Sequence, residues 1–173
     1  MNKNSKIVVT GAAGLVGQNL IVLLKDRGYS NIVAIDKHSD NIKILKELHP
    51  DLTILEKDLT NIDKEIEDSF DNADVVLMLH AQIGALTIDP FQKNNIDATE
   101  NVLQIIKSKN IPYLVHISSS VVKSVADDFY TNTKKIQEDL VINSGINHCV
   151  LRPTIMFGWF DRKHFGWLSR YME

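Results

Sequence analysis

The stretch from Ile7 to Gln18 places a short apolar, β-branched run directly before a turn with three glycines, spaced three residues apart, at Gly11, Gly14 and Gly17. Glycine lets a backbone turn tightly and lets another group approach it closely. A helix that begins directly after such a turn points unpaired N–H groups and the positive end of its dipole at the turn. The pattern therefore predicts a strand, a pyrophosphate-binding turn and a helix, although Gly-rich turns also simply join strands to helices.

A second apolar strand is predicted from Asn31 to Asp36, and its last residue is an acid about twenty residues after the glycines. In a dinucleotide site, an acid at this point accepts hydrogen bonds from the adenosine ribose hydroxyls and repels a 2′-phosphate. We therefore expect Asp36 to favour NAD. Lys37 and His38 follow immediately and keep NADP as the alternative.

Strand-like and helix-like segments alternate along the whole chain. The predicted strands cover residues 6–10, 31–36, 52–55, 73–80, 111–118 and 147–152, and the predicted helices cover 14–27, 39–49, 61–70, 91–109 and 130–144. This alternation is typical of an α/β fold, a Rossmann-type doubly wound parallel sheet with helices on both faces and the strand order 3-2-1-4-5-6. A ligand is expected at the carboxyl ends of the strands, where that order reverses.

Composition and charge exclude several classes of function. The chain has 173 residues, enough for one domain with a real core, and its net charge of -3 indicates no binding of nucleic acid. No apolar run approaches membrane-spanning length, and the first residues lack the apolar core of a signal peptide, so we expect a cytoplasmic protein. A single cysteine excludes an internal disulfide, and the six histidines lack metal-ligand spacing, so no metal site is expected.

A tyrosine and a lysine, Tyr130 and Lys134, are spaced to share one face of a helix. A lysine cation and a positively charged nicotinamide both favour the phenolate form of a neighbouring tyrosine. Such a tyrosine can remove or return a hydroxyl proton while a hydride moves to or from the nicotinamide. The serines from Ser118 to Ser120 end the fifth predicted strand, where one of them can hold the same substrate oxygen. The combination indicates dehydrogenase chemistry, although a Tyr-x-x-x-Lys pair alone is a weak signal.

These motifs, in this order, resemble the extended short-chain dehydrogenase/reductase family, the nucleotide-sugar epimerases and dehydratases in particular. The turn resembles the family's GxxGxxG. The segments Ser118–Ser120 and Tyr130–Lys134 resemble its catalytic elements. Four further segments are similar to family motifs: Asp58-Leu59 to the adenine-contacting pair, Leu79–Ala81 to HLAA, residues 95–103 to NxxGTxNLL with Ala98 in place of glycine, and residues 151–158 to LRPxxVYG.

The resemblance implies roles for individual residues. Tyr130 is the expected base, Lys134 the residue that holds the nicotinamide ribose, and Ser119 or Ser120 the hydroxyl partner. Ser119 is preferred because Val122 then matches the family's valine. The implied cofactor is NAD, and the residues expected to contact it are Gly11, Ala13, Gly14, Leu15, Val16, Gly17, Asp36, Lys37, Asp58, Leu59, His80, Ala81, Gln82, Asn95, Ser118, Tyr130, Lys134 and Pro153.

The resemblance also implies a nucleotide-sugar substrate and a homodimer formed through helices 91–109 and 130–144. The chain departs from the family where Lys123 and Ser124 replace a tyrosine and a glycine. We expect residues 1–158 to form the NAD(P)-binding domain, and the aromatic, basic residues 159–173 to begin a substrate domain that is largely absent. Three functions follow: an NAD-dependent epimerase, dehydratase or reductase, a module that binds NAD without turnover, or a subunit that completes its site with another chain docked on the aromatic tail.

Overall fold

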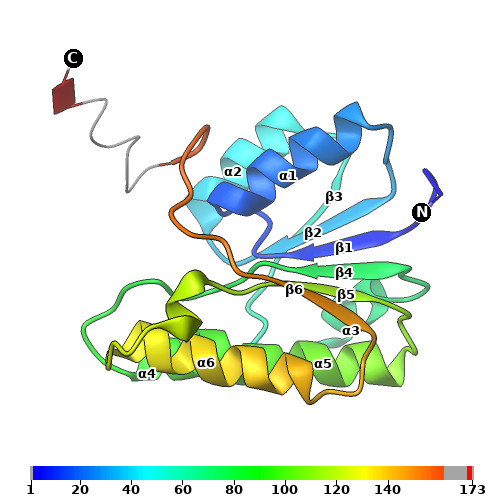
Figure 1. Ribbon diagram of the computed structural model, residues 1–173. Helices are drawn as coiled ribbons and strands as arrows, with labels where there is room; N and C mark the ends of the chain where they lie inside the picture. The colour runs from blue at the N-terminus through cyan, green and yellow to red at the C-terminus, as the bar shows by residue number, and fades with distance from the viewer. Residues whose placement is uncertain (1, 162–170, 173) are drawn as a thin grey trace.

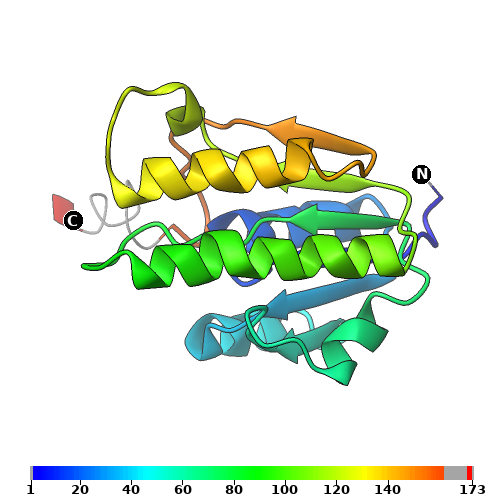
Figure 2. The same ribbon diagram turned by 90° about the horizontal axis from the view of Figure 1, so that it is seen from below.

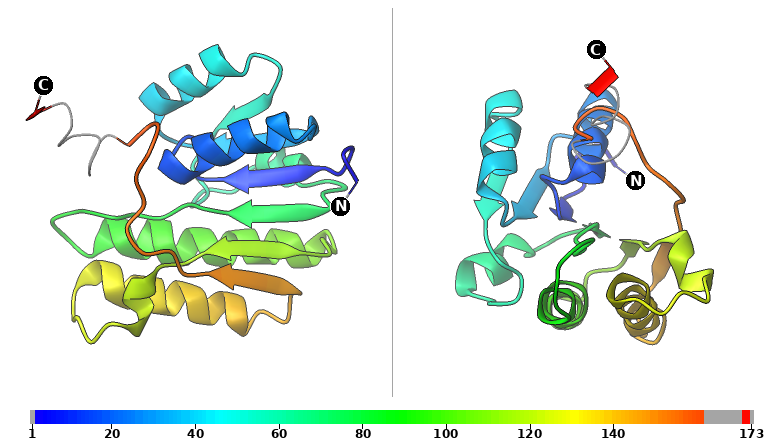
Figure 3. Two further views of the ribbon diagram at one scale, coloured as in Figure 1. Left: turned by 45° about the horizontal axis from the view of Figure 1, so that its top comes forward. Right: turned by 90° about the vertical axis from the view of Figure 1, so that its left-hand side faces the viewer.

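One six-stranded sheet forms the centre of the protein. The computed structural model describes residues 2–161 and 171–172. Its strands are all parallel and follow the order β3-β2-β1-β4-β5-β6, as predicted. They comprise β1 (Ile7–Thr10), β2 (Ile32–Asp36), β3 (Thr53–Glu56), β4 (Val75–Met78), β5 (Leu114–Ile117) and β6 (His148–Leu151). Because the strands are parallel, their carboxyl ends meet at one edge (Figure 3), and the predicted Rossmann-type fold is confirmed.

Helices cover both faces of the sheet (Figure 1). One face carries α1 (Leu15–Asp26) and α2 (Ser39–Leu48), and the other carries α3 (Lys64–Ser69), α4 (Asp89–Phe91), α5 (Ala98–Ser108) and α6 (Phe129–Ile142). On that second face α5 and α6 run side by side (Figure 2). In the described residues, no helix is long and apolar enough to cross a membrane. A cytoplasmic location remains a prediction.

Two apolar clusters, one on each face, explain why the inner strands read as continuous hydrophobic runs. In β1, Ile7 and Val9 pack against α1 and α2, whereas Val8 packs into the cluster under α5 and α6. All three side chains are fully buried. A parallel strand covered on both faces buries every residue, so its sequence does not alternate between apolar and polar.

Two helices differ from the sequence prediction. The helix predicted to begin at Phe91 begins at Asp89 and contains a π-helical segment, η1 (Gln92–Asp97), between α4 and α5. A π turn adds one residue to the repeat, which a periodicity of 3.6 residues does not detect. The acidic helix predicted from residue 61 starts only at Lys64, because the side chain of Asp63 accepts a hydrogen bond from Ile66 N and caps the helix there.

The chain after β6 crosses from the sheet towards α1 (Figure 1). The side chain of Asn19 on α1 donates a hydrogen bond to the carbonyl of Trp159 over 2.7 Å, and the Trp159 side chain is 83% exposed. Phe165 and Trp167, part of the aromatic tail in the sequence, lie outside the described residues. The domain boundary at 158 stays a prediction.

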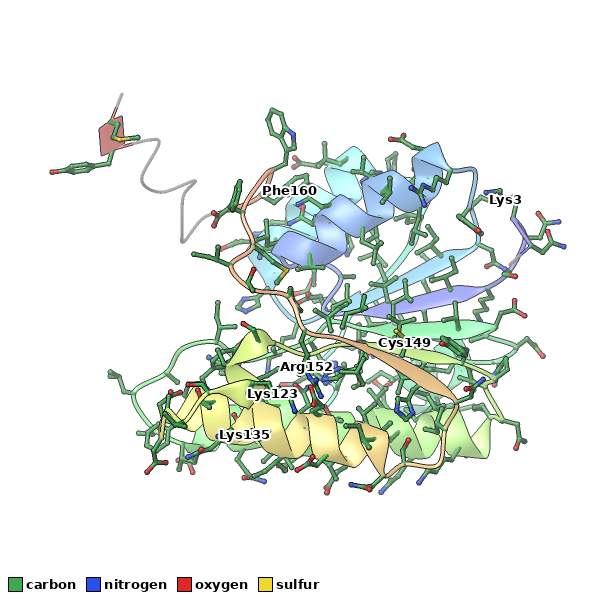
Figure 4. All side chains as sticks on the ribbon, in the orientation of Figure 1. Lys3, Lys123, Lys135, Cys149, Arg152 and Phe160 are labelled. Carbon is green, nitrogen blue, oxygen red and sulfur yellow. The ribbon has the colours of Figure 1, made fainter. Side chains whose placement is uncertain are left out.

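An ion pair joins α6 to the residue after β6 (Figure 4). Nε and Nη2 of Arg152 donate to both carboxylate oxygens of Glu138 over 2.6–3.1 Å, and Glu138 is only 5% exposed. The hydrogen bonds from Arg152 hold the pKa of Glu138 below its ordinary value of 4.5, although burial opposes this shift. A bidentate guanidinium–carboxylate pair fixes the relative orientation of the two elements.

The contact between Gly17 and the glycine turn leaves no space for a side chain. A Cβ on Gly17 would lie 2.4 Å from Ala12 O, which is backbone and cannot rotate away. We expect Gly17→Ala to lower the free energy of unfolding by about 2 kcal/mol through overpacking. Gly84→Ala is the matched control, since a Cβ there has nothing within 4 Å. Denaturant unfolding measures both, and equal stability of the two variants would contradict the close contact.

Removal of Arg152 is expected to destabilise the protein in a pH-dependent way. Arg152→Leu leaves the Glu138 carboxylate without its cation, so the free energy of unfolding is expected to fall near neutral pH, by less than for a fully buried pair because the Arg152 side chain is 37% exposed. The pKa of folded Glu138 is lowered, so its contribution is present above pH 4.5 and is lost as the pH falls through the folded pKa. Unfolding curves of wild type and variant should therefore converge in acid. A difference that does not change with pH would show that the ion pair is not its source.

Candidate active site

The glycine turn after β1 lies against the chain that follows β4. Gly11 has φ +68°, and a Cβ there would lie 2.6 Å from His80 N. Gly14 is the N-cap of α1, no side chain caps this helix, and a Cβ on Gly14 would approach only Gly11 O, at 3.3 Å. The turn is therefore packed on its inner side, and the start of α1 presents backbone N–H groups on its outer side.

Asp36, at the end of β2, is fixed against this turn. One carboxylate oxygen accepts hydrogen bonds from the backbone N–H of Lys37 (2.7 Å) and of His38 (3.0 Å), and the other accepts from Ala13 N (2.9 Å). The Ala13 side chain is fully buried and its N–H binds Asp36, so neither group is available to a ligand. A carboxylate has about four acceptor positions, and the one that remains on Asp36 suits a hydroxyl donor.

The Lys37 side chain points away from Asp36 and towards Asp58, in the loop after β3. Its ammonium donates to Asp58 Oδ2 (3.0 Å) and to Asn94 Oδ1 (2.5 Å). Burial opposes the charge of Asp58, but hydrogen bonds from Thr60 and Lys37 outweigh it and hold the pKa of Asp58 below its usual value. A cation engaged in this way is not placed to bind a 2′-phosphate at Asp36. Leu59, expected beside Asp58, packs into the core, so only its backbone can face a ligand.

His80 bridges two elements. Its Nδ1 pairs with Thr10 Oγ1 (2.8 Å) and its Nε2 with Thr99 Oγ1 (3.1 Å). Burial, followed by the charges of Lys134 and Lys37, lowers the pKa of His80 to about 3, so the ring is neutral. His80 therefore ties the end of β1 to α5. Ala81, the next residue, is exposed.

The π-helical segment η1 carries a fully buried asparagine, Asn95. Its Oδ1 accepts from Gln82 N (2.6 Å), and its Nδ2 donates to Gln82 O (3.2 Å) and to Thr133 Oγ1 (3.0 Å). Asn95 thus orients the loop after β4 and joins it to α6. The side-chain amide of Asn95, a residue expected to contact NAD, is thus engaged by the protein itself.

The three serines after β5 lie in different environments. Ser118 is buried, and its N–H donates to Leu151 O of β6. Ser119 caps a 3₁₀ turn, η2 (Ser120–Lys123); its Oγ accepts from Val121 N (3.3 Å), which leaves the hydroxyl hydrogen able to donate to a ligand oxygen. Ser120 is exposed, and its N–H donates to Pro153 O.

Tyr130 and Lys134 lie one turn apart on α6, as predicted. Asp128 caps this helix by accepting hydrogen bonds from Thr131. Tyr130 is partly exposed, whereas Lys134 is only 1% exposed, and its Nζ donates to Ile117 O (3.2 Å) and Gln137 Oε1 (2.5 Å). Burial lowers the pKa of Lys134 to about 8, against the opposing charge of Glu138, so the side chain is still mostly charged at pH 7.

Polar residues that the sequence motifs did not reveal connect these groups. Gln137, fully buried, links Lys134 to Thr99 and to the carbonyl of His80. A polar residue on the buried face of α6, three positions after Lys134, is the only sequence signal for Gln137. Thr99 lies in the segment 95–103 that resembles NxxGTxNLL, whereas Thr133 reads as an ordinary helix residue. Among the described residues, no group of three or more His, Cys, Asp and Glu side chains can hold a metal ion.

The residues at this edge suit a dinucleotide. The uncapped N-terminus of α1 provides donors for a pyrophosphate, and Asp36 provides an acceptor for ribose hydroxyls. The buried Lys134 ammonium has three N–H donors; two are used by Ile117 and Gln137, and one is left for a ligand.

Comparison with known proteins points the same way. The curated relatives include a 3 beta-hydroxysteroid dehydrogenase/Delta 5-->4-isomerase from Mycobacterium tuberculosis, 27% identical over 92% of this chain and 49% of its own length. They also include human short-chain dehydrogenase/reductase family 42E member 1, 21% identical over 99% of this chain and 51% of its own. The chain thus spans about half the length of the curated relatives it matches.

Solved structures match along nearly the whole chain. UDP-glucuronic acid 4-epimerase from Bacillus cereus, in complex with NAD, is 29% identical with a TM-score of 0.81, over 96% of this chain and 63% of that one. The Bordetella bronchiseptica enzyme WbmH, at 20% identity, has a TM-score of 0.84 over 98% of this chain and 62% of that one, and shows the shared fold. The model of the NAD dependent epimerase/dehydratase family matches residues 7–166. The chain therefore belongs to the NAD dependent epimerase/dehydratase family, and NAD is its cofactor.

Proposed function

We propose that this chain is the NAD-binding part of an enzyme that acts on a nucleotide-linked sugar with Tyr130 as the proton-transferring base. One observation carries the proposal: Tyr130 and Lys134 share one face of α6, beside the serines that follow β5, at the sheet edge that also holds the glycine turn and Asp36. Each element alone is common, but their convergence on one edge of a Rossmann-type sheet supports hydride chemistry.

The side chains have distinct roles in this proposal. Bound NAD supplies the acceptor and donor of hydride. Tyr130 removes a proton from a substrate hydroxyl and returns it, and Ser119 donates a hydrogen bond to the same oxygen. Lys134 holds the nicotinamide ribose with its remaining N–H and favours the phenolate of Tyr130.

The geometry of the site supports the cofactor contacts of this proposal. In the proposal, the turn from Gly11 to Gly17 and the start of α1 bind the pyrophosphate. Asp36 binds the adenosine ribose, and Asp58 lies at the adenine end. The engagement of Lys37 with Asp58 and Asn94 supports NAD rather than NADP, because it removes the nearest cation from the position of a 2′-phosphate.

The substrate class rests on the solved relatives. Bacillus cereus UDP-glucuronic acid 4-epimerase binds UDP-glucuronic acid and NAD, and it is 29% identical to this chain. Because the matched relatives are longer than this chain, the pocket for the sugar and the choice between epimerisation, dehydration and reduction belong to the proposal for the whole protein.

A second candidate is the oxidation of a secondary alcohol on an apolar ring. Exposed apolar side chains lie on the loops after β4, η2 and β6, at the same edge of the sheet; examples are Leu86, Val125 and Phe157. The first curated relatives are named as hydroxysteroid dehydrogenases. These exposed apolar side chains are the observation that favours an apolar substrate as the second candidate.

The decisive experiment combines NAD binding with a substrate panel. The chain is incubated with NAD and either UDP-linked sugars or a 3β-hydroxysteroid, and NADH absorbance and product formation are followed. Tyr130→Phe is expected to reduce turnover at least about 100-fold while NAD affinity stays within about twofold, because only the proton transfer is lost. Retained turnover in Tyr130→Phe would refute the assigned base. Binding of NAD with no turnover of any substrate would instead support a binding module.

We further propose a homodimer through α5 and α6, which lie side by side on one face of the sheet (Figure 2). Ile136 and Ile142 on α6 are 45% and 44% exposed. Exposed apolar side chains on α6, which lies beside α5, suit a helix-to-helix interface.

In light scattering, wild type is expected to have the mass of a dimer and Ile136→Glu the mass of a monomer, because the charge would be buried in the interface. Leu48→Glu is the control, since Leu48 is 50% exposed on α2, on the opposite face. A dimer that persists in Ile136→Glu, or is lost in Leu48→Glu, would place the interface elsewhere.

A further inference from the structure

Gln137 is fully buried although its amide carries two donors and an acceptor. It lies on α6 three residues after Lys134, so both side chains enter the same space beneath the carboxyl ends of β4 and β5. A buried amide costs free energy unless its polar atoms are paired. In Gln137 both ends of the amide have partners.

The partners of the amide nitrogen determine which way the amide faces. Nε2 donates to Thr99 Oγ1 (2.9 Å) and to the backbone carbonyl of His80 (3.3 Å). A carbonyl oxygen can only accept, so the NH₂ group must lie on that side. Oε1 is therefore directed at Lys134 Nζ, 2.5 Å away. The reversed amide would set an NH₂ group against an ammonium and an oxygen against an oxygen.

The charges around Lys134 make this acceptor important. Burial disfavours the ammonium, and Glu138, which favours it, is itself paired with Arg152. His80 and His116 flank Lys134, but burial and the charge of Lys134 lower the pKa of His80 to about 3 and that of His116 to about 2, so both rings are neutral. Direct stabilisation of the ammonium comes from Gln137 Oε1 and Ile117 O.

We infer that Gln137 is a positioning residue that fixes the Lys134 ammonium at the NAD site and keeps it protonated, with Thr99 and the His80 backbone as its anchor. The inference rests on the proposed function for the importance of Lys134 to the cofactor. The contact between Gln137 and Lys134 itself is independent of it. The Gln137 amide oxygen and the Ile117 carbonyl each accept one of the lysine's N–H groups, which leaves the third for the nicotinamide ribose.

The protonation of Lys134 can be measured directly in the full chain. Lysine labelled with carbon-13 at Cε is followed by NMR from pH 6 to 11, and the Lys134 signal is assigned by its loss in Lys134→Met. We expect the wild-type signal to titrate near pH 8. In Gln137→Met, which keeps the length of the side chain but removes both polar ends, the midpoint should fall by about one pH unit.

The variant Gln137→Glu separates positioning from a purely structural role. Its carboxylate is a stronger acceptor for the ammonium, so the Lys134 midpoint should rise, although the loss of the NH₂ donors destabilises the fold as in Gln137→Met. If Gln137 acts on Lys134, the two variants shift the Lys134 midpoint in opposite directions although both lower the stability of the fold. A purely structural role would not produce opposite shifts. Gln104→Met, on the exposed face of α5, is the control and should leave the midpoint unchanged.

NAD titrations over the same pH range complete the test. Wild-type affinity should fall above pH 8 as Lys134 loses its proton, and in Gln137→Met the fall should begin about one pH unit lower. Unchanged Lys134 midpoints in both Gln137 variants would overturn the inference, whether or not NAD binds. If the midpoints shift as expected but wild type does not bind NAD, the proposed function fails while the control of Lys134 by Gln137 stands.

Discussion

The contact between Gly11 and the backbone of His80 is the constraint on which the rest of the site depends. The two backbones are so close that no Cβ fits between them. The turn after β1 and the loop after β4 can therefore pack together where the strand order reverses only because residue 11 is glycine. His80 then reaches from this point to Thr10 on one side and to Thr99 on the other. The glycine turn and α5 on the opposite face are thus joined through one residue.

From His80 the polar contacts continue to the buried ammonium of Lys134. Thr99 and the His80 carbonyl orient Gln137, and Gln137 orients Lys134. Since His80 and His116 are neutral, the ammonium of Lys134 is the charge that this buried space presents. Groups fixed in advance need little reorganisation when a ligand binds, which is how a site of this kind stabilises charge.

Several features of the site followed from local sequence. The glycine spacing, the acid that ends β2 and the Tyr-x-x-x-Lys pair each lie within one or two neighbouring elements, so a periodicity or a spacing reveals them. In the structure, Asp36 lies against the turn and accepts a hydrogen bond from Ala13 N. The engagement of Lys37 with Asp58 and Asn94 was not predictable, because Asn94 is 57 residues away in the chain and no local pattern links them.

The sequence by itself determined the fold class, the strand order and the family, because alternating apolar strands and amphipathic helices admit few arrangements and parallel strands align their ends at one edge. Only the tertiary structure decided what each polar side chain does there. It distinguished Ser119, which caps η2, from the exposed Ser120. It also showed that His80 contacts both Thr10 and Thr99 and that Gln137 contacts Lys134. The physical reason is that buried polar groups must pair, and their partners come from elements distant in sequence.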